Sequence, residues 1–379
     1  MSKLFFASDY QEGCHPAILE RLAATNLEHA VGYGYDPHSE HARALIREAC
    51  AAPNAEIQFL VGGTQANEVV ISCALRPWQA VVAATSGHVS VHEAGAIEAG
   101  GHKVIELPEH DGKIGAAQVE ACATAWETDG NRDHMVQPGM VYVSQPTECG
   151  TLYTRAELEA LASACHAHGM LLYLDGARLA YALAAPENDV TLVNLARLCD
   201  VFYIGGTKCG ALFGEAVVVP DPATIPHFFT QIKQHGALLA KGFVTGKQFE
   251  VLFEDRPQAD GPRADGTQHG PQADGTQHGP QADGTQRRTQ GRLYERLGQP
   301  AIAAARRIKA ALGEKGIPVC MENPTNQTFL VADSALLARL DGRVEYGFWE
   351  RLDAEHTVIR LATSWATSEQ DVDDLLALL

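Results

Sequence analysis

The chain has 379 residues, of which 46% are hydrophobic and 20% charged, proportions typical of a globular protein with a large core. The formal net charge of −18 argues against nucleic acid and anionic membranes as partners, because both would repel an acidic surface. No apolar run approaches the roughly 18 residues of a membrane span, and the first residues lack a signal peptide's apolar stretch, so we predict a cytoplasmic protein. Nine scattered cysteines without a C-x-x-C pair indicate neither a disulfide framework nor a metal site.

From residue 55 to residue 220, short apolar runs alternate with helical patterns. Residues 55–63, 80–88, 103–108, 140–148, 170–178, 201–208 and 215–220 contain the strand-like runs. Helical patterns lie between them at 64–75, 89–100, 116–126, 154–169 and 190–198. Strands that alternate with helices of this length predict a mainly parallel sheet covered by helices on both faces. The predicted fold class is therefore α/β.

The segment from Arg256 to Gln290 differs from the rest, because PQADGTQHG recurs in it with a nine-residue period. Its only apolar residues are alanines, so it buries too little surface to offset its ordering entropy, and we predict disorder. The alternative is a metal site, since the repeat carries the potential ligands Asp265, His269, Asp274, His278 and Asp283.

After the repeat, residues 291–316 and 371–379 read as helices, and 324–332 and 357–363 read as strands. We predict four parts of the chain: an N-terminal arm over residues 1–8, a large domain over 9–253, the disordered insert over 254–291, and a small C-terminal α+β domain over 292–379.

Unusual polar residues follow the strand-like runs at the points where the runs end. In parallel sheets the ligand lies beyond the carboxyl ends of the strands, so these residues are expected at one edge. Each alone has a simpler explanation: Gly63 and Thr64 could form a turn and cap, His88 could be packed, Asp175 could cap a helix, and Lys208 could reach the surface. The full set comprises Gly62, Gly63, Thr64, His88, Thr147, Glu148, Asp175, Arg178 and Lys208.

Together these residues describe a site for pyridoxal phosphate. Lys208 would form an imine with the aldehyde, which requires a partly desolvated amine. Asp175 would pair with the pyridinium nitrogen and keep the ring an electron sink. The turn at Gly63 and Thr64 would bind the phosphate at a helix N-terminus, and His88 would stack on the ring. The glycine turn matches neither nucleotide-binding pattern, which argues against nucleotides.

At these residues the chain resembles the low-specificity threonine aldolase and β-eliminating lyase family. The resemblance is carried by FASDY, GYGYDP, VGGTQANE, GHVSVHEAGA, LYLDGARL, GGTKCGALFG, PTNQTF and VIRLATSWAT, which span nearly the whole chain apart from the repeat. It implies an aspartate-aminotransferase-like fold with pyridoxal phosphate at the interface of a homodimer or homotetramer. The lysine and DGAR motifs are fairly specific for this cofactor family, but none decides the reaction.

The resemblance also implies further site residues. Ser8 and Arg360 would bind the α-carboxylate of an amino acid substrate, because a guanidinium fork suits a planar anion. Arg178 would assist near that carboxylate or the cofactor phosphate. Tyr33 is expected to enter the site from the neighbouring subunit, and Lys233 to reach the cofactor phosphate across the same interface.

One departure from the family concerns the general base. Where many threonine aldolases carry a second histidine, this chain has Glu148 in the segment SQPTE. The base could therefore be Glu148, His88 or His92. The leading hypothesis is cleavage of a β-hydroxy-α-amino acid to glycine and an aldehyde, with Lys208, His88 and Glu148 as catalytic residues. The alternatives are β-elimination, transamination or racemisation with the same cofactor, and a non-catalytic protein that binds pyridoxal phosphate.

Overall fold

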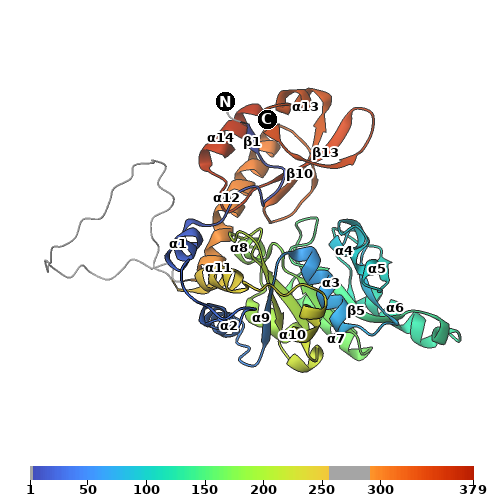
Figure 1. The fold of residues 1–379 in the computed structure, drawn as a ribbon. Helices are drawn as coiled ribbons and strands as arrows, with labels where there is room; N and C mark the ends of the chain where they lie inside the picture. Colours follow the sequence, from blue (N-terminus) through green and yellow to red (C-terminus); the bar gives the residue numbers. More distant parts are fainter. Residues whose placement is uncertain (1–2, 256–290) are drawn as a thin grey trace, which may run out of the picture.

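The computed structural model describes residues 3–255 and 291–379. The predicted disorder and the alternative metal site in the repeat therefore lie outside the described residues. Figure 1 shows the large domain built around one sheet, with the C-terminal residues gathered beside it. The long helix α12 (Leu293–Glu314) contacts α8 (Leu179–Ala184) of the large domain as well as the C-terminal elements, and so joins the two parts.

The large sheet has seven strands in the order β2-β8-β7-β6-β5-β3-β4. Only β8 runs antiparallel to its neighbours, so the other strands share one direction, and the predicted mainly parallel α/β sheet is confirmed. The strands are β2 (Glu56–Leu60), β3 (Gln79–Ala84), β4 (Val104–Leu107), β5 (Gln137–Ser144), β6 (Leu171–Asp175), β7 (Val201–Gly205) and β8 (Glu215–Val219).

Both faces of this sheet are buried, which explains why its strands read as continuous apolar runs. Alternate residues of each strand join two separate core clusters. The larger cluster packs on α1 (Pro16–Ala24), α2 (Pro37–Ala49), α6 (Ala116–Thr128), α7 (Arg155–Ala167), α8, α9 (Leu192–Leu198) and α11 (Phe243–Phe253). The other packs mainly on α3 (Gly63–Ala74) and α10 (Phe228–Gln234).

The prediction of one continuous helix over residues 89–100 is wrong. The structure has two short helices there, α4 (His88–Val91) and α5 (Ala96–Ala99). Ala94 and Gly95 between them both adopt the left-handed backbone conformation, with φ of 52° and 75°. Left-handed residues cannot continue a right-handed helix, so the chain turns at this point.

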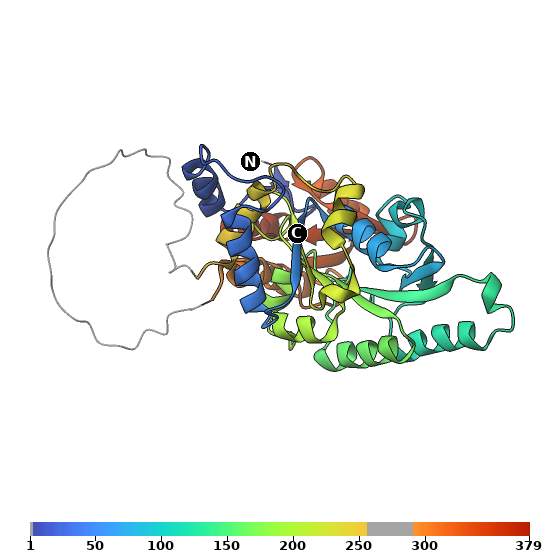
Figure 2. The same ribbon diagram turned by 60° about the horizontal axis from the view of Figure 1, so that its bottom comes forward.

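The C-terminal part is an antiparallel sheet in the order β12-β13-β10-β9, packed on helices. Its strands are β9 (Val319–Met321), β10 (Gln327–Asp333), β12 (Gly347–Arg351) and β13 (His356–Ala362), and its helices are α12, α13 (Ser334–Leu340) and α14 (Glu369–Leu378). Figure 2 shows these elements behind the large domain. The N-terminal strand β1 (Leu4–Phe5) pairs with β11 (Val344–Glu345), so the start of the chain lies on the C-terminal part. None of the helices in the described ranges combines the length and the apolar character that crossing a bilayer requires.

Candidate active site

The polar residues predicted to gather do so at the carboxyl edge of the large sheet. Asp175 is the last residue of β6, and Lys208 follows β7 by three residues. His88 begins α4 after β3, and Gly63 begins α3 after β2. The charges of Glu148, Asp175 and Lys208 all act on the His88 ring, which places these groups around one space.

Four donors form hydrogen bonds with the side chain of Asp175. Its side chain accepts the Tyr142 hydroxyl at 2.6 Å, the Tyr203 hydroxyl, the Asn67 amide at 3.2 Å and the Ala177 N–H at 2.9 Å. Burial alone would raise the pKa of this carboxyl, but the nearby His88 and these hydrogen bonds lower it below its ordinary value. Asp175 is therefore a buried anion whose position is fixed within the chain.

A second buried carboxylate lies beside His88. Glu93 accepts Nδ2 of Asn67 at 2.6 Å, and the same Glu93 oxygen lies 2.7 Å from Nδ1 of His88. Burial favours the neutral imidazole, but the hydrogen bond to Glu93 and the charges of Glu148 and Asp175 outweigh it and raise the pKa of His88. The adjacent His92, whose ring centroid lies 5.6 Å away, has a pKa lowered by burial. His88 thus holds a proton more readily than His92.

Arg178 is bound mainly to a residue for which no role was predicted. Its guanidinium donates to the Asp9 carboxylate through two nitrogens, at 2.7 and 3.1 Å, and Asn326 donates to the same carboxylate at 2.9 Å. Burial opposes ionisation of Asp9, but Arg178 outweighs it and lowers the pKa of Asp9 to about 2. The remaining terminal nitrogen of Arg178 lies 3.8 Å from Glu148.

Arg360 lies near Arg178 and has an unused donor. Its terminal nitrogens donate to the Ala7 carbonyl at 3.0 Å and to the Gln327 amide at 3.2 Å. Its Nε is buried and has no hydrogen-bond partner among the described residues. Burial and the neighbouring charge of Arg178 lower the pKa of Arg360, as expected when two cations share a desolvated space. Ser8 lies between Ala7 and Asp9, which contact the two arginines.

Backbone hydrogen bonds hold the loop that carries Lys208. Gly206 and Thr207 both donate their N–H groups to the Gly214 carbonyl, and Gly206 also donates to the buried Glu215 carboxyl at 2.9 Å. Burial raises the pKa of Glu215 to about 8. The ammonium of Lys208 lies 5.8 Å from the Tyr10 ring centroid, and no described residue accepts a hydrogen bond or forms an ion pair with it. Hydrogen bonds therefore hold the loop backbone, while the amine of Lys208 is available.

Tyr33 and Lys233 lie together, and both are exposed. The Lys233 ammonium is 4.4 Å from the Tyr33 ring centroid, and 40% of Tyr33 is exposed. Within the described part of the chain, neither makes a hydrogen bond or ion pair with Lys208, His88 or Asp175. The structure therefore brings these two predicted residues to each other.

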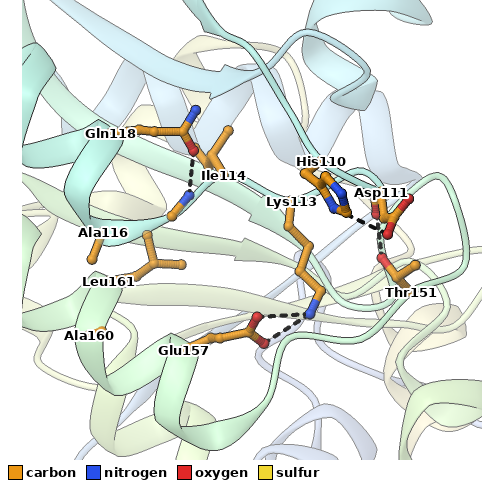
Figure 3. Close-up of a pocket in the computed structure, with 11 residues that line it drawn as sticks. His110, Asp111, Lys113, Ile114, Ala116, Gln118, Thr151, Glu157, Ala160 and Leu161 are labelled. Atoms are coloured by element: carbon orange, nitrogen blue, oxygen red, sulfur yellow. Dashed lines mark hydrogen bonds and ion pairs between the residues drawn. The ribbon is translucent and has the colours of Figure 1, made fainter.

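A pocket among the described residues is bordered by none of these side chains. It has a volume of about 410 Å³ and borders the start of α6 and α7, where Lys113 forms an ion pair with Glu157 at 2.9 Å (Figure 3). None of the predicted site residues lines it. A cavity of about 10 Å³ does border Glu148 and Tyr142. We place the candidate site at the sheet edge, because the ionised groups that chemistry needs converge there.

The side chains at this edge fit pyridoxal phosphate. Asp175 is a buried anion suited to a pyridinium, although a ring nitrogen would have to share or replace one of the two tyrosine hydroxyls on that carboxylate. A side chain at Gly62 would meet nothing within 4 Å, so there is open space before the first turn of α3 for a phosphate. A side chain at Gly63 would instead come within 3.1 Å of the Tyr203 hydroxyl. Thr64 in the same turn is exposed.

The side chains that form hydrogen bonds with the predicted site residues were not predicted from the sequence. Tyr142, Tyr173 and Tyr203 each stand two positions before the end of neighbouring strands, and the period of two places all three on one face of the sheet. That repetition is a readable signal. Asp9 adjoins Ser8 in a motif already singled out. Asn67 and Glu93 also stand in quoted motifs, but no local pattern marks their contact with each other, because they are 26 positions apart in sequence.

Comparison with known proteins identifies the family and the fold. Residues 6–332 match the family model described as β-eliminating lyase. A solved structure of Leishmania major threonine aldolase is 39% identical, covers 99% of this chain and 98% of its own, and superposes with a TM-score of 0.86. The low specificity L-threonine aldolase of Pseudomonas aeruginosa is 29% identical over 253 residues, which are 66% of this chain and 72% of that protein. Aspartate aminotransferase from Thermus thermophilus, at 15% identity with coverage of 99% and 90%, shares the fold with a TM-score of 0.66.

Proposed function

The chain belongs to the β-eliminating lyase family, and on that premise we propose that it is a pyridoxal-phosphate-dependent lyase that cleaves β-hydroxy-α-amino acids to glycine and an aldehyde. The 39% identity to Leishmania major threonine aldolase over nearly the full length supports this substrate class. The single observation that carries the proposal is the meeting of Lys208, His88 and Asp175 at one sheet edge beside two arginines.

Lys208, Asp175 and the turn at Gly63 would hold the cofactor. When bound, pyridoxal phosphate supplies an electron sink for a bond at the substrate Cα. Asp175 would supply the negative charge that pairs with the pyridinium nitrogen, because four donors within the chain stabilise its ionised form. His88, at the start of α4, would cover the ring face, and the phosphate would lie at Gly63 and Thr64.

The arginines would bind the substrate carboxylate. Arg360 has a buried and unpartnered Nε, and a carboxylate is the natural acceptor for such a donor. Arg178 adds positive charge nearby while Asp9 fixes its orientation through two hydrogen bonds. Ser8 lies between the contacts of the two arginines and would add a hydroxyl. A carboxylate held in this way would fix the orientation of the substrate Cα at the site.

Two groups are candidates for the base that takes the β-hydroxyl proton. Glu148 lies within ion-pair distance of Arg178, and its charge acts on His88, His92 and Arg360. It therefore faces the same space as the substrate arginines. His88 can exchange a proton in the physiological range. We assign proton transfer to this pair, with Glu148 in the place where many family members carry a histidine.

The exposed side of the site would be completed by a second subunit. Leu27, Val31 and Tyr35 are 88%, 64% and 61% exposed, and they flank Tyr33 in one segment. Such a stretch is typical of a subunit interface. In a homodimer or homotetramer, Tyr33 and Lys233 of each subunit would reach the neighbouring site. A cytoplasmic location without nucleic acid or membrane partners remains a prediction from composition.

The test is glycine release from a panel of β-hydroxy amino acids. We expect the purified, cofactor-loaded protein to release one glycine per aldehyde from L-threonine, L-allo-threonine or phenylserine. Release of ammonia and a 2-oxo acid instead would indicate β-elimination, the reaction in the family's description. A bound cofactor without any turnover would favour the non-catalytic alternative.

A further inference from the structure

Glu93 is a deeply buried charged group at the site, and no role has been given to it. Its side chain has no exposed surface. One oxygen faces both His88 and Asn67, while the other is buried and has no partner among the described residues. A buried carboxylate with an unsatisfied oxygen is costly, and such groups are usually retained where function needs them.

Asn67 connects Glu93 to Asp175. Its amide nitrogen donates one hydrogen to each of these carboxylates, at 2.6 and 3.2 Å, and its oxygen accepts the Tyr173 hydroxyl at 2.8 Å. The orientation of the amide follows from its partners, because two carboxylates can only accept and a hydroxyl can donate. Every polar hydrogen of the Asn67 side chain is therefore used, and His88 and Asp175 belong to one network.

The hydrogen bond to Glu93 also determines the tautomer of His88. The Glu93 oxygen next to Nδ1 already accepts from Asn67 and acts as an acceptor toward His88 as well. Nδ1 must then carry a hydrogen in both the neutral and the protonated ring. The other ring nitrogen, Nε2, is left as the atom that gains and loses a proton.

We propose that Glu93 is a positioning residue that fixes the orientation and tautomer of His88, so that His88 transfers its proton at Nε2, and that Asn67 ties this pair to Asp175. This inference rests on the proposed function for the use of that proton. The orientation and tautomer of His88 are a separate question from which group removes the proton of the substrate hydroxyl.

Several charges face His88 from the surrounding elements. Glu93 follows α4, Glu148 follows β5, Asp175 ends β6 and Lys208 follows β7, and the His92 ring lies beside it. The three carboxylates favour the protonated ring, and Lys208 opposes it. Removing the charge of Glu93, which also makes the only hydrogen bond to the ring among the described residues, should therefore shift the proton equilibrium furthest.

The experiment is ring nitrogen NMR of histidine in the full-length, cofactor-loaded protein. Selective ¹⁵N labelling gives the tautomer and the pKa of each ring, and loss of a signal in His88→Asn identifies His88. We expect a neutral ring with its hydrogen on Nδ1 and a pKa above the ordinary 6.5 in the unaltered protein. In Glu93→Gln the pKa should fall by about one unit or more. Glu98→Gln, the same change at an exposed residue five positions along, should leave it unaltered.

Glu93→Asp provides the second variant, because it keeps the charge but shortens the side chain. We expect its His88 pKa to lie between those of Glu93→Gln and the unaltered protein, and it serves alone if Glu93→Gln does not fold. A His88 pKa that is the same in the unaltered protein and in the folded Glu93 variants, or a neutral ring with its hydrogen on Nε2, would overturn the inference. The NMR signals do not require turnover. A protein that cleaves no substrate would therefore refute the proposed function, while the measured tautomer and pKa of His88 would still test this inference.

Discussion

Two clusters in this molecule each place histidine against a buried carboxylate, but they differ in what else surrounds it. At Glu93 the carboxylate meets one histidine and one amide, and one of its oxygens is unpartnered among the described residues. At Glu250, on α11, the carboxylate accepts from Arg21 and lies 2.8 Å from Nδ1 of both His38 and His41. The second carboxylate is saturated by groups from α1 and α2.

The surroundings decide which cluster can do chemistry. One nitrogen of His41 and one oxygen each of Glu250 and Glu254 lie within 4.8 Å of one another, a spacing that could suit a metal ion. Arg21 donates to both carboxylates and already supplies the positive charge. The Glu250 cluster therefore joins helices, whereas the Glu93 cluster lies at the carboxyl ends of parallel strands, beside an available amine and two arginines.

The largest effect should come from Lys208→Ala. If the sheet edge is the site, this variant should lose activity by on the order of a thousandfold or more and trap no cofactor on borohydride reduction. Mass spectrometry of the reduced protein measures the trapped group. Lys113→Ala is the matched control, since Lys113 forms its ion pair with Glu157 in the separate pocket. Trapped cofactor in Lys208→Ala would assign the covalent bond to another lysine.

Arg360→Lys should have the next largest effect and act on substrate binding. Lysine keeps the charge but loses the planar fork and the Nε donor that is free in this structure. We expect KM for the amino acid to rise roughly ten- to a hundredfold with a smaller change in kcat, as measured by steady-state kinetics. An unchanged KM would mean that Arg178 binds the carboxylate without Arg360.

Glu250→Gln tests the other cluster. Removing its charge leaves Arg21 without one of its partners and should lower the free energy of unfolding by about 2 kcal/mol. The absorbance of the bound cofactor and kcat should stay the same. Urea unfolding together with the activity assay separates the two properties. A loss of activity at unchanged stability would show that the Glu250 cluster takes part in function.

The smallest effect concerns pH and His38. Burial favours its neutral ring, but hydrogen bonds to Glu28 and Glu250 raise its pKa above the ordinary 6.5. The protonated ring therefore stabilises the fold fully below pH 6.5, and this contribution is lost as pH rises through the higher folded pKa. We expect less than about 1 kcal/mol, because the pair with Glu28 is partly exposed. Unfolding of His38→Gln should accordingly depend less on pH between 6 and 8 than that of the unaltered protein.

The sequence predicted the parts of this molecule that local patterns determine. Apolar runs gave the strands of the large sheet, and their ends located Asp175, His88 and Lys208 at one edge, because parallel strands end together. The break at Ala94 was not predicted, since a non-glycine residue in the left-handed conformation leaves no clear sequence signal. Glu93 and Asn67 were missed because contacts between residues 26 positions apart depend on how α3 packs against the turn after α4.

We expect the sheet edge to carry out carbon–carbon cleavage. The decisive measurement is proton NMR of the products formed when the cofactor-loaded protein is incubated with L-threonine. We expect glycine and acetaldehyde in equal amounts. Appearance of 2-oxobutanoate without glycine would contradict it and would indicate elimination, with Glu148 as the first residue to examine for redirecting the reaction.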